Sequence, residues 1–199
     1  MDKLKSLLKE KGIDANITLQ DIPDIDLYMD QVIQLFENKF SKSKRDESEK
    51  VLTKTMINNY AKGKLFFPIK NKKYSKEHLM LISLIYQLKG VLSINDIKVV
   101  LEGINEKIVK EDFKIDQFYS SYLQLTEKNS AKFQVDLQQK VQDAKLEIEK
   151  LGDKNHEYLE KVLLITSLAY MSNLYRKVSE ILVDDLNQNN KKIKDSSPN

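Results

Sequence analysis

The residue types of one segment, from Thr53 to Lys76, suggest a chemistry. This segment is a run of lysines and short polar side chains. It holds seven lysines and no acidic residue. Residues 1–52 carry a net charge of −2, residues 53–101 carry +7 and residues 102–199 carry −2, so the excess positive charge is local. A one-signed field on a folded segment favours a polyanionic partner such as DNA. The alternative is an inert solvated face in a lysine-rich protein.

The polar residues of this run have types that suit a DNA duplex. Asn58 and Asn59 carry amides that can pair bidentately with adenine in the major groove, and Thr55 offers a short hydroxyl beside them. The lysines would contact phosphates and supply most of the affinity. The candidate phosphate-contacting lysines are Lys54, Lys62, Lys64, Lys70, Lys72, Lys73 and Lys76. Tyr74 is a further candidate through its phenolic OH, although a place in the core is the simpler interpretation of this tyrosine.

Short helices must position these side chains. Thr53 is expected to cap a helix whose inward residues are Met56, Ile57 and Tyr60. Gly63 is expected to end that helix, because glycine accepts the left-handed conformation found after a helix C-terminus.

The elements after this helix follow from the same signals. Residues 65–74 are too short for a helix and fit a small hairpin or an extended loop. Ser75 is expected to begin the next helix, which ends at Gly90. Ser93 is expected to cap a further short helix through Leu101.

The order of short helix, basic loop, helix, tight turn and short helix resembles the N-terminal domain of MerR-type transcription regulators. The similarity rests on Thr53 at the capping position, Tyr60 at the helix end, and Gly63 and Leu65 near the family's Gly-Leu pair. Pro68, Tyr74 and the turn Gly90-Val-Leu-Ser93 complete it. The resemblance implies a winged helix-turn-helix over residues 51–104, with double-stranded DNA as the partner.

Three positions depart from the MerR pattern. Asn58, Lys70 and Ser75 stand where that family usually has arginine. Arginine binds phosphate through a planar fork, which lysine lacks. These departures keep open an alternative function, a protein-interaction adaptor that reuses the fold without DNA.

The N-terminal segment supplies a second resemblance. Ile25, Met29, Val32, Ile33 and Phe36 recur on one helical face after Pro23, with Asp24 or Asp26 as the expected cap. The wholly polar stretch 41–50 is expected to be a loop. With the segment IPDIDLYMDQVIQLF included, the whole chain is similar to a bacterial family called domain of unknown function 1836, for which a MerR-like fold has been suggested.

The C-terminal part has a long helical pattern from residue 115 to residue 151, followed by a turn over residues 152–155. A seam with heptad-like spacing is formed by Phe133, Leu137, Val141, Ala144, Ile148 and Leu151. A final helix is expected from His156 to Leu186, before a frayed polar tail over residues 187–199. Its middle, VLLITSLAYM, is apolar nearly all round and is expected to be buried on several sides.

This hairpin predicts a homodimer, because a single copy would leave much apolar surface exposed. The MerR resemblance adds a small-molecule effector as a further partner, with an aromatic pocket as its site. The aromatic residues that could line it are Phe113, Phe118, Tyr119, Tyr122, Tyr158 and Tyr170, and core packing is the favoured interpretation of all six.

Several function classes are disfavoured. The chain has no cysteine, and its histidines, His78 and His156, lie far apart and are interpreted as ordinary surface or interface residues. We therefore expect no metal or other cofactor and no catalytic site. The N-terminus lacks the pattern of a signal peptide, and no apolar stretch is long enough to span a bilayer, which favours a cytoplasmic protein that does not enter the membrane.

The expected architecture is all-α, a winged helix-turn-helix with a small wing followed by a long-helix hairpin. Three segments make it up: residues 1–50 as an N-terminal helix and polar linker that pack on the DNA-binding unit, residues 51–104 as that unit, and residues 105–199 as the dimerisation or effector domain. The expected function is a DNA-binding regulator that reads a roughly palindromic operator as a homodimer.

Overall fold

The protein is built almost entirely from helices, as a computed structural model that describes residues 2–111 and 113–196 shows. The all-α class is therefore confirmed, with one two-stranded antiparallel sheet added. The elements in chain order are α1 Asp2–Lys11, β1 Leu27–Tyr28, α2 Met29–Phe40, the 3-10 helix η1 Ser41–Ser43, α3 Lys54–Lys62, β2 Lys73–Tyr74, α4 Lys76–Leu88, α5 Ile94–Lys110, α6 Ile115–Glu149 and α7 His156–Ser196.

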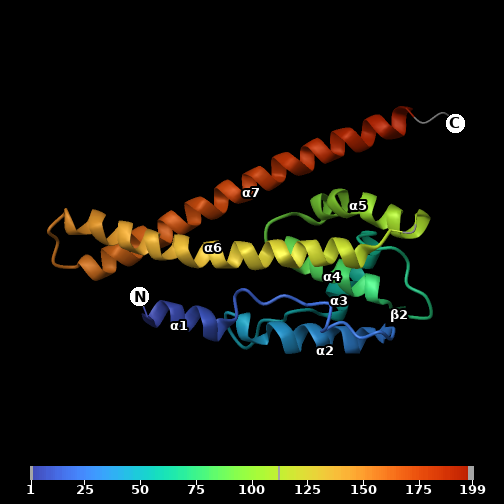
Figure 1. Cartoon of the computed structure of the whole chain (residues 1–199), viewed down its shortest axis with the longest axis horizontal. Helices are drawn as coiled ribbons and strands as arrows, with labels where there is room; N and C mark the ends of the chain where they lie inside the picture. Colours follow the sequence, from blue (N-terminus) through green and yellow to red (C-terminus); the bar gives the residue numbers. More distant parts are fainter. Residues whose placement is uncertain (1, 112, 197–199) are drawn as a thin grey trace.

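Helix α4 lies at the centre of the N-terminal part. Its residues 78–85 are all buried, so it is covered on every side. In Figure 1, α1 and α2 lie on one side of the long helix α6, and α5 and α7 lie on the other. The core formed around α4 includes Phe36 of α2, Ile57 of α3, Ile97 of α5 and Tyr119 of α6.

The start of α2 differs from the expectation. Neither Asp24 nor Asp26 caps it, because the chain first runs through strand β1, and Tyr28 takes the N-cap position. The backbone N–H of Tyr28 donates to Oε1 of Gln31 over 2.8 Å. Ile25 lies before β1 and is exposed, whereas Val32 and Phe36 are buried as the helical pattern predicts.

Helix α3 begins and ends where expected, but the left-handed residue after it is not the expected one. Thr53 caps the helix by accepting a hydrogen bond from the backbone N–H of Met56 at 3.1 Å. Gly63 follows the helix but has a right-handed φ of −70°, and the left-handed residue is the next one, Lys64, with φ +56°. The N–H of Leu65 donates to the carbonyl of Tyr60 at 3.0 Å, which is the bond that closes a Schellman motif. The turn thereby brings the Leu65 side chain into the core.

Two helices continue beyond their expected ends. Helix α5 is capped by Ser93 as predicted but runs to Lys110 rather than Leu101, because Ile104 and Ile108 keep packing against the core. Helix α7 runs to Ser196, so the polar stretch after Leu186 is helical and not frayed, while residues 197–199 lie outside the described residues. Neither stretch has a proline at its expected end, and the one glycine, Gly103, costs a helix only about 1 kcal/mol.

Helices α6 and α7 form the expected hairpin, with its turn at residues 150–155. Leu137, Ala144 and Ile148 of the predicted seam are buried, whereas Phe133 and Leu151 are exposed. The middle of α7 was expected to be buried on several sides, and that prediction is wrong for a single copy, because Val162, Ile165 and Tyr170 are exposed. One side of this stretch does pack, because Leu164 and Leu168 are half-buried. Farther from the turn, α7 diverges from α6 (Figure 1). Among the described residues, no helix is both long and apolar enough to cross a membrane.

A buried hydroxyl joins three segments that are distant in sequence. Tyr119 of α6 and Ser83 of α4 are both inaccessible to solvent. The Tyr119 hydroxyl donates to the carbonyl of Ile17 at 2.7 Å and accepts from the Ser83 hydroxyl at 2.7 Å. These two bonds fix the N-terminal segment and α6 against the central helix.

Removing this hydroxyl should destabilise the whole N-terminal part. We expect Tyr119→Phe to lower the free energy of unfolding by about 1–3 kcal/mol, because the Ile17 carbonyl and the Ser83 hydroxyl would stay buried without a partner. Urea unfolding followed by circular dichroism measures this change, with Tyr158→Phe at an exposed position as the matched control. Adding Ser83→Ala to Tyr119→Phe should lower the free energy of unfolding by less than Ser83→Ala does in the wild type. Equal losses for the two tyrosine variants would show that the buried bonds contribute nothing.

Candidate nucleic-acid interface

The exposed face of α3 carries the polar side chains that the sequence singled out. Thr55, Asn58, Asn59 and Lys62 are all exposed, and their spacing of three, one and three places them on one side of the helix. Ile57 and Tyr60 are buried on the opposite side. The helix therefore presents two amides, a hydroxyl and an ammonium group to an outside partner.

The lysine-rich loop after α3 ends in a tight two-residue turn. The N–H of Lys73 donates to the carbonyl of Lys70 at 2.9 Å, and Asn71 and Lys72 at the tip have φ values of 52° and 59°. Two successive positive φ angles are those of a type I′ hairpin turn, whose twist matches that of strands. Lys70 and Lys72 are exposed, as is Lys64 at the other end of the loop.

The loop pairs with a segment that the sequence did not point to. Strand β2 is antiparallel to β1, with Tyr28 opposite Lys73 and Leu27 opposite Tyr74. The Lys73 Nζ lies 5.1 Å from the centre of the Tyr28 ring, within the range of a cation–π contact. The predicted small hairpin is thus extended by the N-terminal segment. Strands of two residues carry no alternating pattern, so no local signal marked this pairing.

Tyr74 does not belong to the exposed surface. It is 1% exposed, and its ring packs edge-on against Phe66 at 6.1 Å and against His78 at 6.0 Å between ring centres. Its candidate DNA contact is therefore corrected to the core role that the sequence already favoured, at the base of the loop. The other ten candidate residues are at least partly exposed.

His78 is also a core residue, and its expected place at the surface is wrong. It is 3% exposed. Its Nδ1 accepts from the backbone N–H of Ser75 at 3.1 Å, so its Nε2 carries the proton and donates to the carbonyl of Phe67 at 3.1 Å. Burial lowers the pKa of His78, while the Phe67 carbonyl and the carboxylates of Glu77 and Asp26 oppose that shift. The neutral imidazole fastens the start of α4 to the loop. His156 is exposed at the start of α7, as expected.

Carboxylates lie beside part of the basic surface. Lys54 pairs with Asp30 at 2.7 Å, and Lys76 pairs with Asp24 at 3.4 Å. Both acids come from the β1–α2 region, which the β1–β2 pairing brings to this side of the molecule. The charge of residues 53–76 is therefore partly neutralised. Among the described residues, Lys62, Lys64, Lys70 and Lys72 take part in no ion pair.

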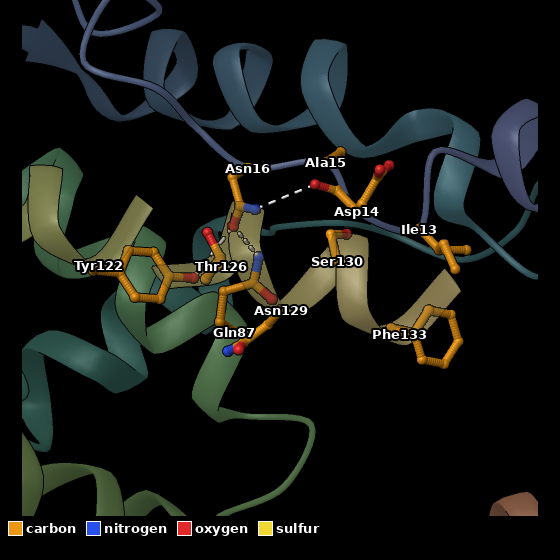
Figure 2. A pocket seen from close by; sticks show the side chains of 10 residues that line it. All are labelled: Ile13, Asp14, Ala15, Asn16, Gln87, Tyr122, Thr126, Asn129, Ser130 and Phe133. Atoms are coloured by element: carbon orange, nitrogen blue, oxygen red, sulfur yellow. Dashed lines mark hydrogen bonds between the residues drawn. The ribbon is translucent and has the colours of Figure 1, made fainter. Parts of the chain in front are cut away.

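A hollow of about 360 Å³, lined by both apolar and polar side chains, lies on another part of the molecule, between the N-terminal segment, α4 and α6 (Figure 2). Asn16 is its central group: its Oδ1 accepts from Gln87 of α4 and from the hydroxyl of Tyr122 of α6, each at 3.2 Å. Of the six aromatic residues considered for an effector pocket, Tyr122 is the one that lines this hollow, and Tyr119 is in the core. Tyr158 and Tyr170 are exposed on α7, so the six do not converge.

One sequence family matches the part of the chain that holds the candidate interface. The sequence model of domain of unknown function 1836 matches residues 17–122. The chain belongs to this family. No curated protein and no solved structure matches the chain. The match includes β1 through α5 and the first turns of α6, so α3, the lysine loop and α4 are all parts of the DUF1836 domain. The expected resemblance to this family is thus confirmed over residues 17–122, while α1, most of α6 and all of α7 lie beyond the match.

The buried neutral histidine of the DUF1836 domain predicts a pH-dependent stability. Because the pKa of His78 is lowered in the folded state, the unfolded chain takes up a proton first as the pH falls through 6.5. Stability should therefore be complete above pH 6.5 and decline below it, down to the lowered pKa of the folded state. We expect His78→Gln, which keeps an acceptor for the Ser75 N–H, to remove this step.

Urea unfolding of the wild type and of His78→Gln at pH values from about 7.5 to about 5 measures the effect. The difference between the free energies of unfolding of the wild type and of His78→Gln should change steadily below pH 6.5. The control His156→Gln, at the exposed histidine, should follow the wild type. A constant difference between wild type and His78→Gln over this range would contradict the assignment of a buried neutral imidazole.

Proposed function

We propose that this protein is a DNA-binding transcription regulator with a MerR-like winged helix-turn-helix, and that it reads a roughly palindromic operator as a homodimer. The observation that carries the proposal is the exposed face of α3. That face presents Thr55, Asn58, Asn59 and Lys62 together, and the chain continues from it into an exposed lysine turn. A helix with short polar groups followed by a basic wing is the arrangement by which many regulators contact a major groove and its flanking phosphates.

The roles of the side chains follow from their chemistry. An asparagine amide can donate to N7 of adenine and accept from its N6 amino group at the same time, so Asn58 and Asn59 are assigned to base contacts. Lys62 at the end of α3 and Lys64, Lys70 and Lys72 in the loop are assigned to phosphates, where an ammonium group acts as a compact charge. Their exposure leaves them available to a duplex.

The carboxylates beside Lys54 and Lys76 do not prevent this binding. The Lys54–Asp30 pair is exposed, with side-chain accessibilities of 63% and 74%. Exposed pairs contribute about 0–1 kcal/mol, so a phosphate can replace Asp30 at little cost. The acids instead lower the affinity for any duplex and leave the base contacts of α3 to decide which sequence is bound.

A small-molecule effector would fit this function at the hollow around Asn16. A ligand there would contact α4, which supports α3, and also α6, which leads to the hairpin. Amide and hydroxyl groups from Asn16, Gln87 and Tyr122 suit a polar ligand that can both donate and accept hydrogen bonds.

A second candidate function is that of an adaptor which binds a protein through the same surface. Two observations favour it: Asn58, Lys70 and Ser75 replace arginines of the MerR pattern, and Asp24 and Asp30 neutralise part of the basic face. Its signature would be a stable complex with a protein and no salt-sensitive binding of duplex DNA.

Fluorescence anisotropy with duplex DNA across a salt series tests the proposed function. We expect the wild type to bind with an affinity that falls steeply with salt. In Lys70→Ala/Lys72→Gly, the log–log slope should become shallower by about one unit for each phosphate that the variant no longer contacts. Glycine at position 72 removes the charge but keeps the positive φ of the turn, so the fold of the loop is retained.

The charge-matched control for this experiment is Lys128→Ala/Lys132→Ala, on an exposed part of α6 away from the loop. This variant should keep the wild-type slope. Absence of duplex binding by the wild type at low salt would reject DNA binding and favour the adaptor. Equal slopes for the loop variant and the α6 control would reject the assignment of the loop lysines.

A further inference from the structure

Residues 170–186 in the middle of α7 expose an apolar face. Leu164, Leu168 and Met171 of its first half are half-buried, and Tyr175, Val178 and Leu182 continue the same alternation of steps of four and three. This is the heptad repeat of a helix that packs along another helix. Figure 1 shows that α7 diverges from α6 along its length, and the later residues of the repeat, Tyr175, Val178 and Leu182, are exposed.

The opposite side of α7 already has a partner. Val183 is buried and belongs to the core, on the side where α7 contacts α5. At roughly 100° per residue, Val183 lies about half a turn around the helix from Leu174. The contact with α5 therefore fixes the position of α7 while its apolar face stays turned away from α5.

The exposed face is large enough for a stable association. It comprises seven residues that are 39–70% exposed: Tyr170, Leu174, Tyr175, Val178, Ile181, Leu182 and Leu186. At roughly 200 Å² for each large apolar residue, these fractions leave on the order of 800 Å² in contact with water. That is about the area that each partner buries in a standard protein–protein interface, and it exceeds the usual largest patch of a monomer, about 300–600 Å².

The spacing of these residues identifies the partner. Counted from Val178, they lie at positions −8, −4, −3, 0, +3, +4 and +8, which is the same pattern in both directions. Two antiparallel copies of α7 that cross at Val178 would therefore place apolar side chains against apolar side chains over the central levels, and Asp185, which lies on the same face, would meet Met171 of the other copy beyond them. The Leu174–Tyr175 level of one copy would meet the Ile181–Leu182 level of the other. A two-fold symmetric interface requires this self-complementarity, and a different partner protein would not.

Two charged residues near the centre of this stretch agree with the pattern. Arg176 and Glu180 pair with each other at 2.8 Å within the helix, and they lie two positions before and after Val178. Two positions along a helix correspond to roughly 200° of rotation, so both side chains point away from the apolar face. Two copies could thus close this face without burying a charge of the central turns.

We propose that two copies of this chain associate through an antiparallel α7–α7 contact centred on Val178. The proposal deepens the proposed function by naming the surface that pairs two DNA-binding units, but its structural argument does not use DNA. The heptad repeat and the exposed area indicate a helical partner, and the two-fold pattern identifies that partner as a second copy.

Oligomeric state is tested first, by sedimentation equilibrium of the full chain. The wild type should be a dimer, and Val178→Glu should raise the dimer dissociation constant about 100-fold or more, because two carboxylates would face each other in an apolar contact. Asn173→Glu places the same charge on an exposed position of another face of α7 and should leave the dimer intact. A monomeric wild type, or equal effects of the two variants, would overturn the proposal.

Cysteine cross-linking then tests the antiparallel geometry in a chain that has no native cysteine. Val178→Cys should form a disulfide-linked dimer on mild oxidation, since the two-fold axis brings position 178 of both copies together. Leu174→Cys alone should not, because about eight positions at about 1.5 Å each separate the two levels by about 12 Å, beyond disulfide reach. A mixture of Leu174→Cys and Leu182→Cys chains should cross-link. Cross-linking of Leu174→Cys with itself would show a parallel pair and overturn the antiparallel contact.

Failure of this proposal is distinguishable from failure of the proposed function. Anisotropy with Val178→Glu at low salt reports duplex binding by the monomer, whose α3 and lysine loop are unchanged. Duplex binding by a wild type that fails to dimerise would leave DNA binding in place and overturn only the interface. A dimer that meets both structural tests but binds no duplex would leave the α7 contact in place and reject DNA binding.

Discussion

The complete burial of α4 is the constraint on which the rest of the structure depends. Eight successive residues, 78–85, are almost fully withdrawn from water, so the helix needs a neighbour on every side. Most of these residues are apolar and pack without direction, and the two polar ones must be given partners inside the core. His78 is held by Ser75 and the Phe67 carbonyl, and Ser83 is held by Tyr119. Those bonds make the packing specific, because they determine which loop lies over the start of the helix and which turn of α6 lies over its middle.

This constraint accounts for what stays exposed. Helix α3 buries its apolar side, Ile57 and Tyr60, in the core around α4, and its other side is left polar and facing outward. The lysine loop is fastened at its base by Leu65, Tyr74 and His78, so a short turn with two positive φ angles can extend from a rigid support. The same core includes Val183 from the second half of α7, and the apolar face of that helix is left without a partner in a single copy. The candidate DNA surface and the candidate dimer surface are thus formed by residues that do not pack into the core.

The sequence predicted the features that local signals encode. Thr53, Ser75 and Ser93 each precede a helix, the polar face of α3 follows from helical spacing, and the turn of the α6–α7 hairpin lies where glycine and polar residues gather. It did not predict contacts between distant segments: the pairing of Tyr28 with Lys73, the ion pair of Asp30 with Lys54, or the burial of His78. Helix α1 was also not foreseen, and α5 and α7 extended past their expected ends because no proline marked a stop. Of the candidate site, the exposed residues of α3 and the loop could be identified from type and spacing. For Tyr74 the sequence favoured a core place and kept a DNA contact open, and the fold decided for the core.

The central claim, that the outer face of α3 reads a DNA sequence, is tested most directly by selecting genomic fragments with the wild type and with Asn58→Ala/Asn59→Ala. Both side chains are exposed, so the variant should fold as the wild type does. The wild type should enrich fragments that share an inverted-repeat half-site. The variant should keep salt-sensitive binding through its lysines and lose roughly 10- to 100-fold of its preference for those fragments. Enrichment of the same fragments by both proteins, or of none by the wild type, would contradict the account.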